Sequence, residues 1–129
     1  MKKLLLLIVC GLCAVCCSKD SVSGVERFEG KFSGTCEYRP DDGSSSRHNI
    51  TVSVNIKSNE IVVRSVSGFS IPTLRYNNYK EYETNVQAYI NSDTAYSTIM
   101  ISENSLYIDY REIRNGSVGD EYYLDLGKD

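Results

Sequence analysis

The segment 49–66 constrains the fold more than any other part of the chain. Its first half places apolar side chains at every second position, at Ile50, Val52, Val54 and Ile56. Strict alternation of this kind is typical of a β-strand with one buried face. Two turn-forming residues, Ser58 and Asn59, then precede a second β-rich run, so the sequence predicts a β-hairpin here.

The same period of two recurs in the rest of the chain, at residues 26–39, 80–90, 95–102, 106–113 and 121–126. The tyrosines of 80–90 also fit helical spacing, but its Tyr, Thr and Val content favours a strand. We therefore expect an all-β domain, a single antiparallel meander of about seven to eight strands that forms a barrel or a sandwich.

The alternation also predicts which side chains fill the interior. The inward set is Phe32, Cys36, Ile50, Val52, Val54, Ile56, Ile61, Val63, Val86, Ala88, Ile90, Ile99, Ile101, Leu106, Ile108, Leu124 and Leu126. It is mostly branched and medium-sized, which favours a packed core over a ligand cavity. A barrel of about eight strands can also hold one small ligand, so a carrier or inhibitor with an apolar ligand inside remains the alternative.

The N-terminus predicts export. Lys2 and Lys3 precede an apolar run that ends at the pair Cys16 and Cys17, which is typical of a secretory signal peptide. The run is shorter than the about 20 residues that a transmembrane helix needs. We interpret residues 1–16 as a signal peptide, 17–24 as a tether and 25–129 as one domain.

The tetrad Ala14-Val15-Cys16-Cys17 resembles a bacterial lipobox. The resemblance implies cleavage before Cys17 and acylation of its sulfur with chains such as palmitate. The tetrad departs from the pattern where Cys16 stands, because Gly, Ala or Ser is usual there, and Leu is commoner where Ala14 stands. A plain secreted protein is the alternative.

The run Cys17-Ser18-Lys19-Asp20 is similar to the start of many Bacteroidota lipoproteins. The mature chain resembles small Bacteroidota lipoproteins with a lipocalin-like meander, in the segments 30–35, 49–66 and 104–110. That resemblance implies an outer membrane lipoprotein of the cell envelope, on the periplasmic or the cell-surface side.

The charge and the cysteine content of the chain exclude some classes of partner and of chemistry. The chain has a net charge of −3 and no basic cluster, so we expect no nucleic acid partner. The expected contact with the membrane is the lipid anchor. If Cys17 is acylated, Cys36 is the one cysteine of the domain, and without a second cysteine or histidine to activate it we interpret it as a small buried residue.

Residues for catalysis are sparse. His48 is the only histidine, and no phosphate-binding loop, H-E-x-x-H or G-x-S-x-G motif occurs. The run Asp41-Asp42-Gly43 lacks the ligand spacing of an EF-hand and is interpreted as a turn. We expect no enzymatic activity, no cofactor and no metal. A carboxylate pair for glycoside hydrolysis is the weaker interpretation of the acidic residues of the last hairpin, Asp109, Glu112, Asp120 and Glu121.

Ten tyrosines and no tryptophan are the unusual feature of the composition. Tyrosine combines a rigid apolar ring with a polar tip, which suits the binding of sugars or protein loops, although it is also an ordinary strand residue. We expect segment 67–82 to be a long irregular loop that carries recognition. Its candidate binding residues are Phe69, Arg75, Tyr76, Tyr79 and Tyr82. The predicted function is a lipid-anchored binding or accessory module with a glycan or protein partner.

Overall fold

A computed structural model describes residues 24–129 of the chain. The expected signal peptide, the lipid-attachment residue Cys17 and nearly all of the tether lie outside the described residues. A 3₁₀ helix at Val25–Phe28 precedes the first strand, and the described residues otherwise form strands and their connections. The search of these residues finds no helix of the length and apolarity needed to cross a membrane.

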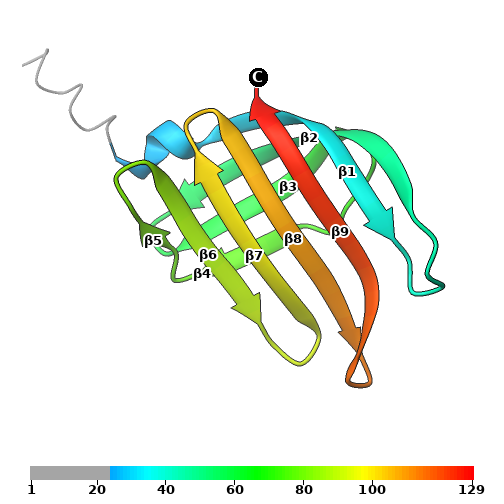
Figure 1. Cartoon of the computed structure of the whole chain (residues 1–129). Helices are drawn as coiled ribbons and strands as arrows, with labels where there is room; N and C mark the ends of the chain where they lie inside the picture. The colour runs from blue at the N-terminus through cyan, green and yellow to red at the C-terminus, as the bar shows by residue number, and fades with distance from the viewer. Residues whose placement is uncertain (1–23) are drawn as a thin grey trace, which may run out of the picture.

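Nine strands form one antiparallel sheet. Their bounds are β1 Gly30–Arg39, β2 Ser46–Lys57, β3 Glu60–Gly68, β4 Leu74–Asn77, β5 Lys80–Glu81, β6 Asn85–Asn91, β7 Ala95–Ser102, β8 Ser105–Arg114 and β9 Ser117–Lys128. Their order is β4-β3-β2-β1-β9-β8-β7-β6-β5, and the sheet curls strongly on itself (Figure 1). The pairing of β1 with β9 joins the two halves of the meander.

The edge strands of the sheet are β4 and β5, and an incomplete seam lies between β4 and the part of β6 that extends beyond β5. Neighbouring strands alternate in direction, so β4 and β5, which are consecutive in the chain, run the same way. Asn78 lies between them with a φ of 56°, in the left-handed region that asparagine tolerates. The chain pairs with β3 before Asn78 and with β6 after Tyr79. The curl brings β4 beside β6, but the sheet has no ladder between them.

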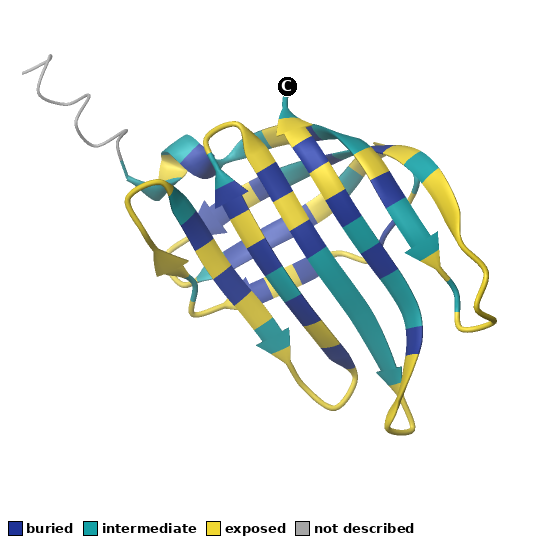
Figure 2. Ribbon diagram, viewed as in Figure 1, coloured by how far each residue is buried: buried dark blue, intermediate teal, exposed yellow. Residues whose placement is uncertain are grey.

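The predicted hairpin is confirmed as β2 and β3. Its register pairs Ile56 with Ile61 and Val54 with Val63, so the apolar side chains share one face. The same alternation of buried and exposed residues follows the length of β6 and β7 and the second half of β9, from Tyr122 onwards (Figure 2). The buried face lines the inside of the curl, and the exposed face forms its outer surface.

The core agrees closely with the predicted inward set. Every member is buried except Ile90, which is half-buried and packs against the core. The sequence pattern missed five members of the core cluster: Phe28, Ile71, Leu74, Tyr76 and Tyr122. Most of these lie on the 3₁₀ helix or in 67–82, where no long alternating run marks them.

Two expectations about the strands were wrong. The sheet has nine strands instead of seven to eight, and both additional strands, β4 and β5, lie in or beside the segment expected to be an irregular loop. β4 has only four residues and β5 has two, which is too short for a period of two to stand out. The strand interpretation of 80–90 was correct for most of its length, because β6 covers Asn85–Asn91.

Gly34 permits a close approach between the main chains of β1 and β9. It shares the inner face of β1 with Phe32 and Cys36. A Cβ atom at Gly34 would lie 2.6 Å from the main-chain oxygen of Asp125 on β9. The tight contact between β1 and β9 therefore requires glycine at this position.

Candidate functional site

The predicted binding residues do not form one surface. Tyr76 is fully buried, so the expectation that it is a surface residue was wrong. Its ring crosses the interior from β4, and its hydroxyl lies 2.7 Å from Ser97 Oγ on β7. Ser97 donates its own proton to the main-chain oxygen of Asp109, so the hydroxyl of Tyr76 is the donor to Ser97.

The other four candidates lie in different environments. Phe69 stacks on His48, with ring centroids 4.2 Å apart. Arg75 pairs with Glu60 on the surface, and Tyr79 is partly buried against the core. Of the five, only Tyr82 projects as an exposed aromatic ring.

A different aromatic surface lies on the outer face of the sheet. Five of the seven large apolar side chains that are exposed among the described residues gather there: Tyr82, Tyr89, Tyr96, Met100 and Tyr107. Their exposed fractions run from 41% to 67%, and they line a hollow of about 690 Å³. We call this hollow the outer tyrosine groove. It falls within the usual size range of ligand sites, about 300–1,000 Å³.

Strand register creates the groove. β6 and β7 pair Asn91 with Tyr96 and Gln87 with Met100, and β7 and β8 pair Met100 with Tyr107. Residues that face each other across antiparallel strands share a face of the sheet. Side chains from three strands therefore meet on the outside, although Tyr89 and Tyr107 are far apart in sequence. The connection after β5 adds Tyr82.

The rest of the lining is polar and almost uncharged. The polar members are Asn78, Lys80, Gln87, Asn91 and Thr98. Among the described residues, Lys80 is the only charged one in the lining, and its Nζ lies 5.8 Å from the centroid of the Tyr82 ring. No acidic residue within 24–129 lines the groove. Four phenol rings and three amides thus offer apolar area together with donors and acceptors.

The inner tyrosines form a second, very different cluster at one end of the curl. The rings of Tyr38 and Tyr122 lie 5.2 Å apart and those of Tyr110 and Tyr122 5.8 Å apart, and Phe69 lies 5.5 Å from Tyr38. Burial, with the nearby charge of Glu112, raises the pKa of Tyr122 to about 12. Tyr122 belongs to the core, and Tyr38, Phe69 and Tyr110 pack against it.

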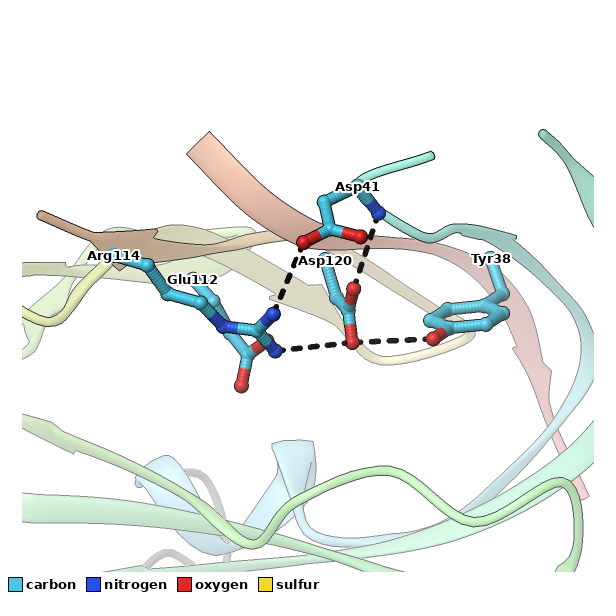
Figure 3. Close-up of polar contacts among 5 residues, drawn as sticks. All are labelled: Tyr38, Asp41, Glu112, Arg114 and Asp120. Atoms are coloured by element: carbon cyan, nitrogen blue, oxygen red, sulfur yellow. Dashed lines mark hydrogen bonds and ion pairs between the residues drawn. The ribbon is translucent and has the colours of Figure 1, made fainter. Parts of the chain in front are cut away.

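Charged residues surround that aromatic end. Tyr38 donates to Oδ2 of Asp120 at 3.1 Å, and the main-chain N–H of Asp41 donates to Oδ1 at 3.2 Å (Figure 3). Arg114 pairs with Glu112, Asp41 and Asp120 at 2.8, 3.2 and 3.4 Å. The carboxylates are thus held by hydrogen bonds and one guanidinium. They fix the long connection after β1 against the turn between β8 and β9.

Neither Cys36 nor His48 lies in surroundings that would activate it for catalysis. Burial raises the pKa of the Cys36 thiol to about 11, with a further contribution from Glu37, so the thiolate form is disfavoured. His48 shares a hydrogen bond of 2.8 Å with Ser46 and stacks on Phe69. Within residues 24–129, no three His, Cys, Asp or Glu side chains form a group that could hold a metal ion.

One sequence signal could have located the groove. Tyr89, Tyr96 and Tyr107 each occupy the phase opposite to the predicted inward residues of their strands, so the alternation already places them outside. The segment 67–82 was predicted to carry the binding residues instead, because it holds large side chains in a long connection.

No protein-family model, curated protein or solved structure matches the chain. The proposal for function therefore rests on the geometry of this chain.

Proposed function

We propose that the protein is a lipid-anchored, non-enzymatic binding module of the cell envelope that holds its ligand in the outer tyrosine groove. The observation that carries the proposal is the concentration of exposed aromatic rings on one part of the outer face. Monomeric proteins seldom expose a contiguous aromatic patch without a use for it. The opposite face of the same strands forms the core, and the outer tyrosines do not belong to it.

The anchor is the other half of the proposal. Acylation of Cys17 attaches the domain to the outer membrane through a tether of a few residues, on the periplasmic or the cell-surface side. Several acyl chains hold firmly, because each buried methylene contributes about 0.8 kcal/mol. A module fixed to a membrane in this way meets a partner already held in the envelope, and modest affinity at the groove is then sufficient.

The alternative of a carrier with an internal ligand has less support. The ring of Tyr76 crosses the interior to Ser97, and Phe28 and Phe32 are fully buried beside branched aliphatic residues. The rings of Tyr38 and Tyr122 also pack on or in this core. An apolar ligand inside would have to displace these side chains, whereas the outer tyrosine groove is open.

Lipid labelling tests the anchor. The wild-type protein should incorporate a labelled fatty acid and sediment with membranes, and Cys17→Ala should lose both properties. Cys16→Ala is the matched control and should still be labelled. Label that persists in Cys17→Ala would show that the cut lies elsewhere.

Binding to purified envelope material tests the groove. The double variant Tyr89→Ala/Tyr107→Ala should bind roughly 100-fold less than wild type, the equivalent of about 2.8 kcal/mol if each ring contributes tenfold. Val66→Ala/Val118→Ala removes two exposed apolar side chains outside the groove and should bind like wild type. Circular dichroism should show that all variants are folded. Equal binding by the groove variant and wild type would contradict the proposal.

A further inference from the structure

The seam between β4 and β6 places unpaired main-chain groups beside the outer tyrosine groove. In antiparallel strands the N–H and C=O of alternate residues point to opposite neighbours. Asn85 accepts a hydrogen bond from Tyr82 on the β5 side, whereas Ser92 donates to Ala95 on the β7 side. By this alternation Tyr89 and Asn91 direct their main-chain groups to the β5 side. Within residues 24–129, the ladder on that side ends at Gln87.

β4 presents the complementary edge. The main-chain N–H of Asn78 donates to Asn59 at 3.0 Å, on the β3 side. Alternation then directs the main-chain groups of Arg75 and Asn77 into the seam, towards β6. A hollow of about 340 Å³ lies between the two edges, lined by Arg75, Asn77, Asn78, Tyr89, Ile90, Asn91 and Ser92.

This hollow is continuous with the outer tyrosine groove. Asn78, Tyr89 and Asn91 line both. A ligand that lies across the exposed rings therefore reaches main-chain donors and acceptors at one end, as well as the amides of the groove.

The width of the seam selects against a peptide strand. Adding a strand between two others requires a spacing of about 9.6 Å, twice the ordinary interstrand distance. Cα atoms of β4 and β6 approach within 8 Å of one another. Recognition by strand addition is thus blocked, while small groups such as hydroxyls can enter and satisfy the free main-chain groups.

The charge of the groove selects against ionic ligands. The whole chain has a net charge of −3, which repels polyanions, and the single cation of the groove, Lys80, lies over the Tyr82 ring. In the part of the chain that the structure describes, no carboxylate lines the groove to pair with a cationic ligand. The ligand that fits is neutral, rich in hydroxyl groups, and has flat apolar patches to lie on the rings of Tyr89 and Tyr107.

From these features, and building on the proposed function, we infer that the outer tyrosine groove and the seam bind a neutral oligosaccharide. Sugar rings stack on the tyrosines along the groove. Hydroxyls at one end of the ligand hydrogen-bond to Asn78, to Asn91 and to the main-chain groups that face the seam. Polar recognition and apolar stacking are thereby separated along one extended site.

Affinity gel electrophoresis and a glycan array test the inference, with the full chain in a detergent that has no sugar headgroup. The probes are neutral polysaccharides (dextran, hydroxyethylcellulose and a galactomannan), the anionic alginate, and neutral and anionic array glycans. We expect wild-type protein to bind at least one neutral glycan and none of the anionic ones. Binding restricted to anionic glycans, or to none of the probes, would overturn the inference.

Two kinds of variant separate the parts of the site. Tyr89→Ala and Tyr107→Ala should each weaken binding of the neutral glycan by roughly tenfold. Asn91→Leu keeps the size of the side chain but removes its hydrogen bonds, and it should cause a similar loss. Asn55→Leu, at an exposed position of β2 away from the groove, is the matched control and should bind as wild type does. Unchanged binding by the three site variants would contradict the proposed geometry.

Treatment of the envelope material distinguishes failure of this inference from failure of the proposed function. Periodate, which cleaves vicinal diols, should abolish groove-dependent binding, and protease should not. If binding still requires Tyr89 and Tyr107 but survives periodate and is lost with protease, the ligand is a protein. In that case the inference of an oligosaccharide ligand is wrong, and the proposed function as a binding module is retained. Binding that is independent of the groove would reject both.

Discussion

The inner and outer tyrosines occupy the same sheet but face different surroundings. Tyr76 and Tyr38 each donate to a defined acceptor, and Tyr122 is held between two other phenol rings. The outer tyrosines, Tyr82, Tyr89, Tyr96 and Tyr107, make no side-chain hydrogen bond with any described residue. Tyrosine therefore stabilises the fold on the inner face of the sheet and is available for a ligand on the outer face.

The largest effect on stability is expected at Tyr76, an inner tyrosine. Tyr76→Ala leaves a cavity and an unpaired Ser97 oxygen, and it should lower the free energy of unfolding by about 3–5 kcal/mol. Denaturant unfolding followed by circular dichroism measures the change. A loss below about 1 kcal/mol would show that Tyr76 does not fill the core. Tyr76→Phe, which removes only the hydrogen bond, should cost about 1 kcal/mol.

The second effect depends on pH. The pKa of Tyr122 is about 12 in the folded protein, against an ordinary value of 10, so the unfolded chain loses this proton first. Its contribution to stability is complete below pH 10 and is lost as the pH rises to about 12. Tyr122→Phe should therefore reduce the fall in stability across this range by up to about 1.4 kcal/mol per pH unit.

The measurement for Tyr122 is the free energy of unfolding at a series of pH values for both proteins. The hydroxyl of Tyr122 has no hydrogen-bond partner among the described residues, so the two proteins should agree within about 0.5 kcal/mol at pH 7. Identical slopes above pH 10 would show that Tyr122 ionises normally in the folded state.

A smaller effect is expected where the aromatic end meets the charged residues. Tyr38→Phe removes the hydrogen bond to Asp120 and should cost about 1 kcal/mol, because this contact is partly exposed to water. Arg114 is half-exposed, so Arg114→Ala should cost less than about 1 kcal/mol despite its three ion pairs. Chemical denaturation ranks the two variants. If Arg114→Ala lowers the free energy of unfolding more than Tyr38→Phe does, the ion pairs rather than the hydrogen bond stabilise this end.

The smallest effect on stability is expected on the outer face. Tyr89→Ala and Tyr96→Ala should each change the free energy of unfolding by no more than about 0.5 kcal/mol. The same denaturation experiment tests this expectation. A loss of several kcal/mol at either position would show that an outer tyrosine stabilises the fold, contrary to the distinction between the two faces.

Much of the fold could be predicted because a period of two is readable along a strand. It located the hairpin of β2 and β3, and it selected a set of inward residues that are all buried except Ile90, which is half-buried. It failed for Tyr76. β4 is only four residues long and lies between Pro72 and Asn78, so Tyr76 could not be distinguished from a loop residue.

The candidate site was far less predictable. The candidates were chosen from one contiguous segment, 67–82, but the structure sends Phe69 to the aromatic end, Tyr76 to the core and Tyr82 to the groove. Adjacency in sequence says little about adjacency in a sheet, because successive side chains point to opposite faces. The outer tyrosine groove instead joins residues from separate strands.

The all-β character, the face on which most residues of the long strands lie and the expectation of a lipid anchor at Cys17 all follow from the sequence alone. Each of these depends on local spacing or on a short motif. Only the tertiary structure decided that Tyr89, Tyr96 and Tyr107 share one surface, and that β4 and β6 approach without pairing. Those features depend on strand register and on the curl of the sheet, which arise from packing between distant parts of the chain.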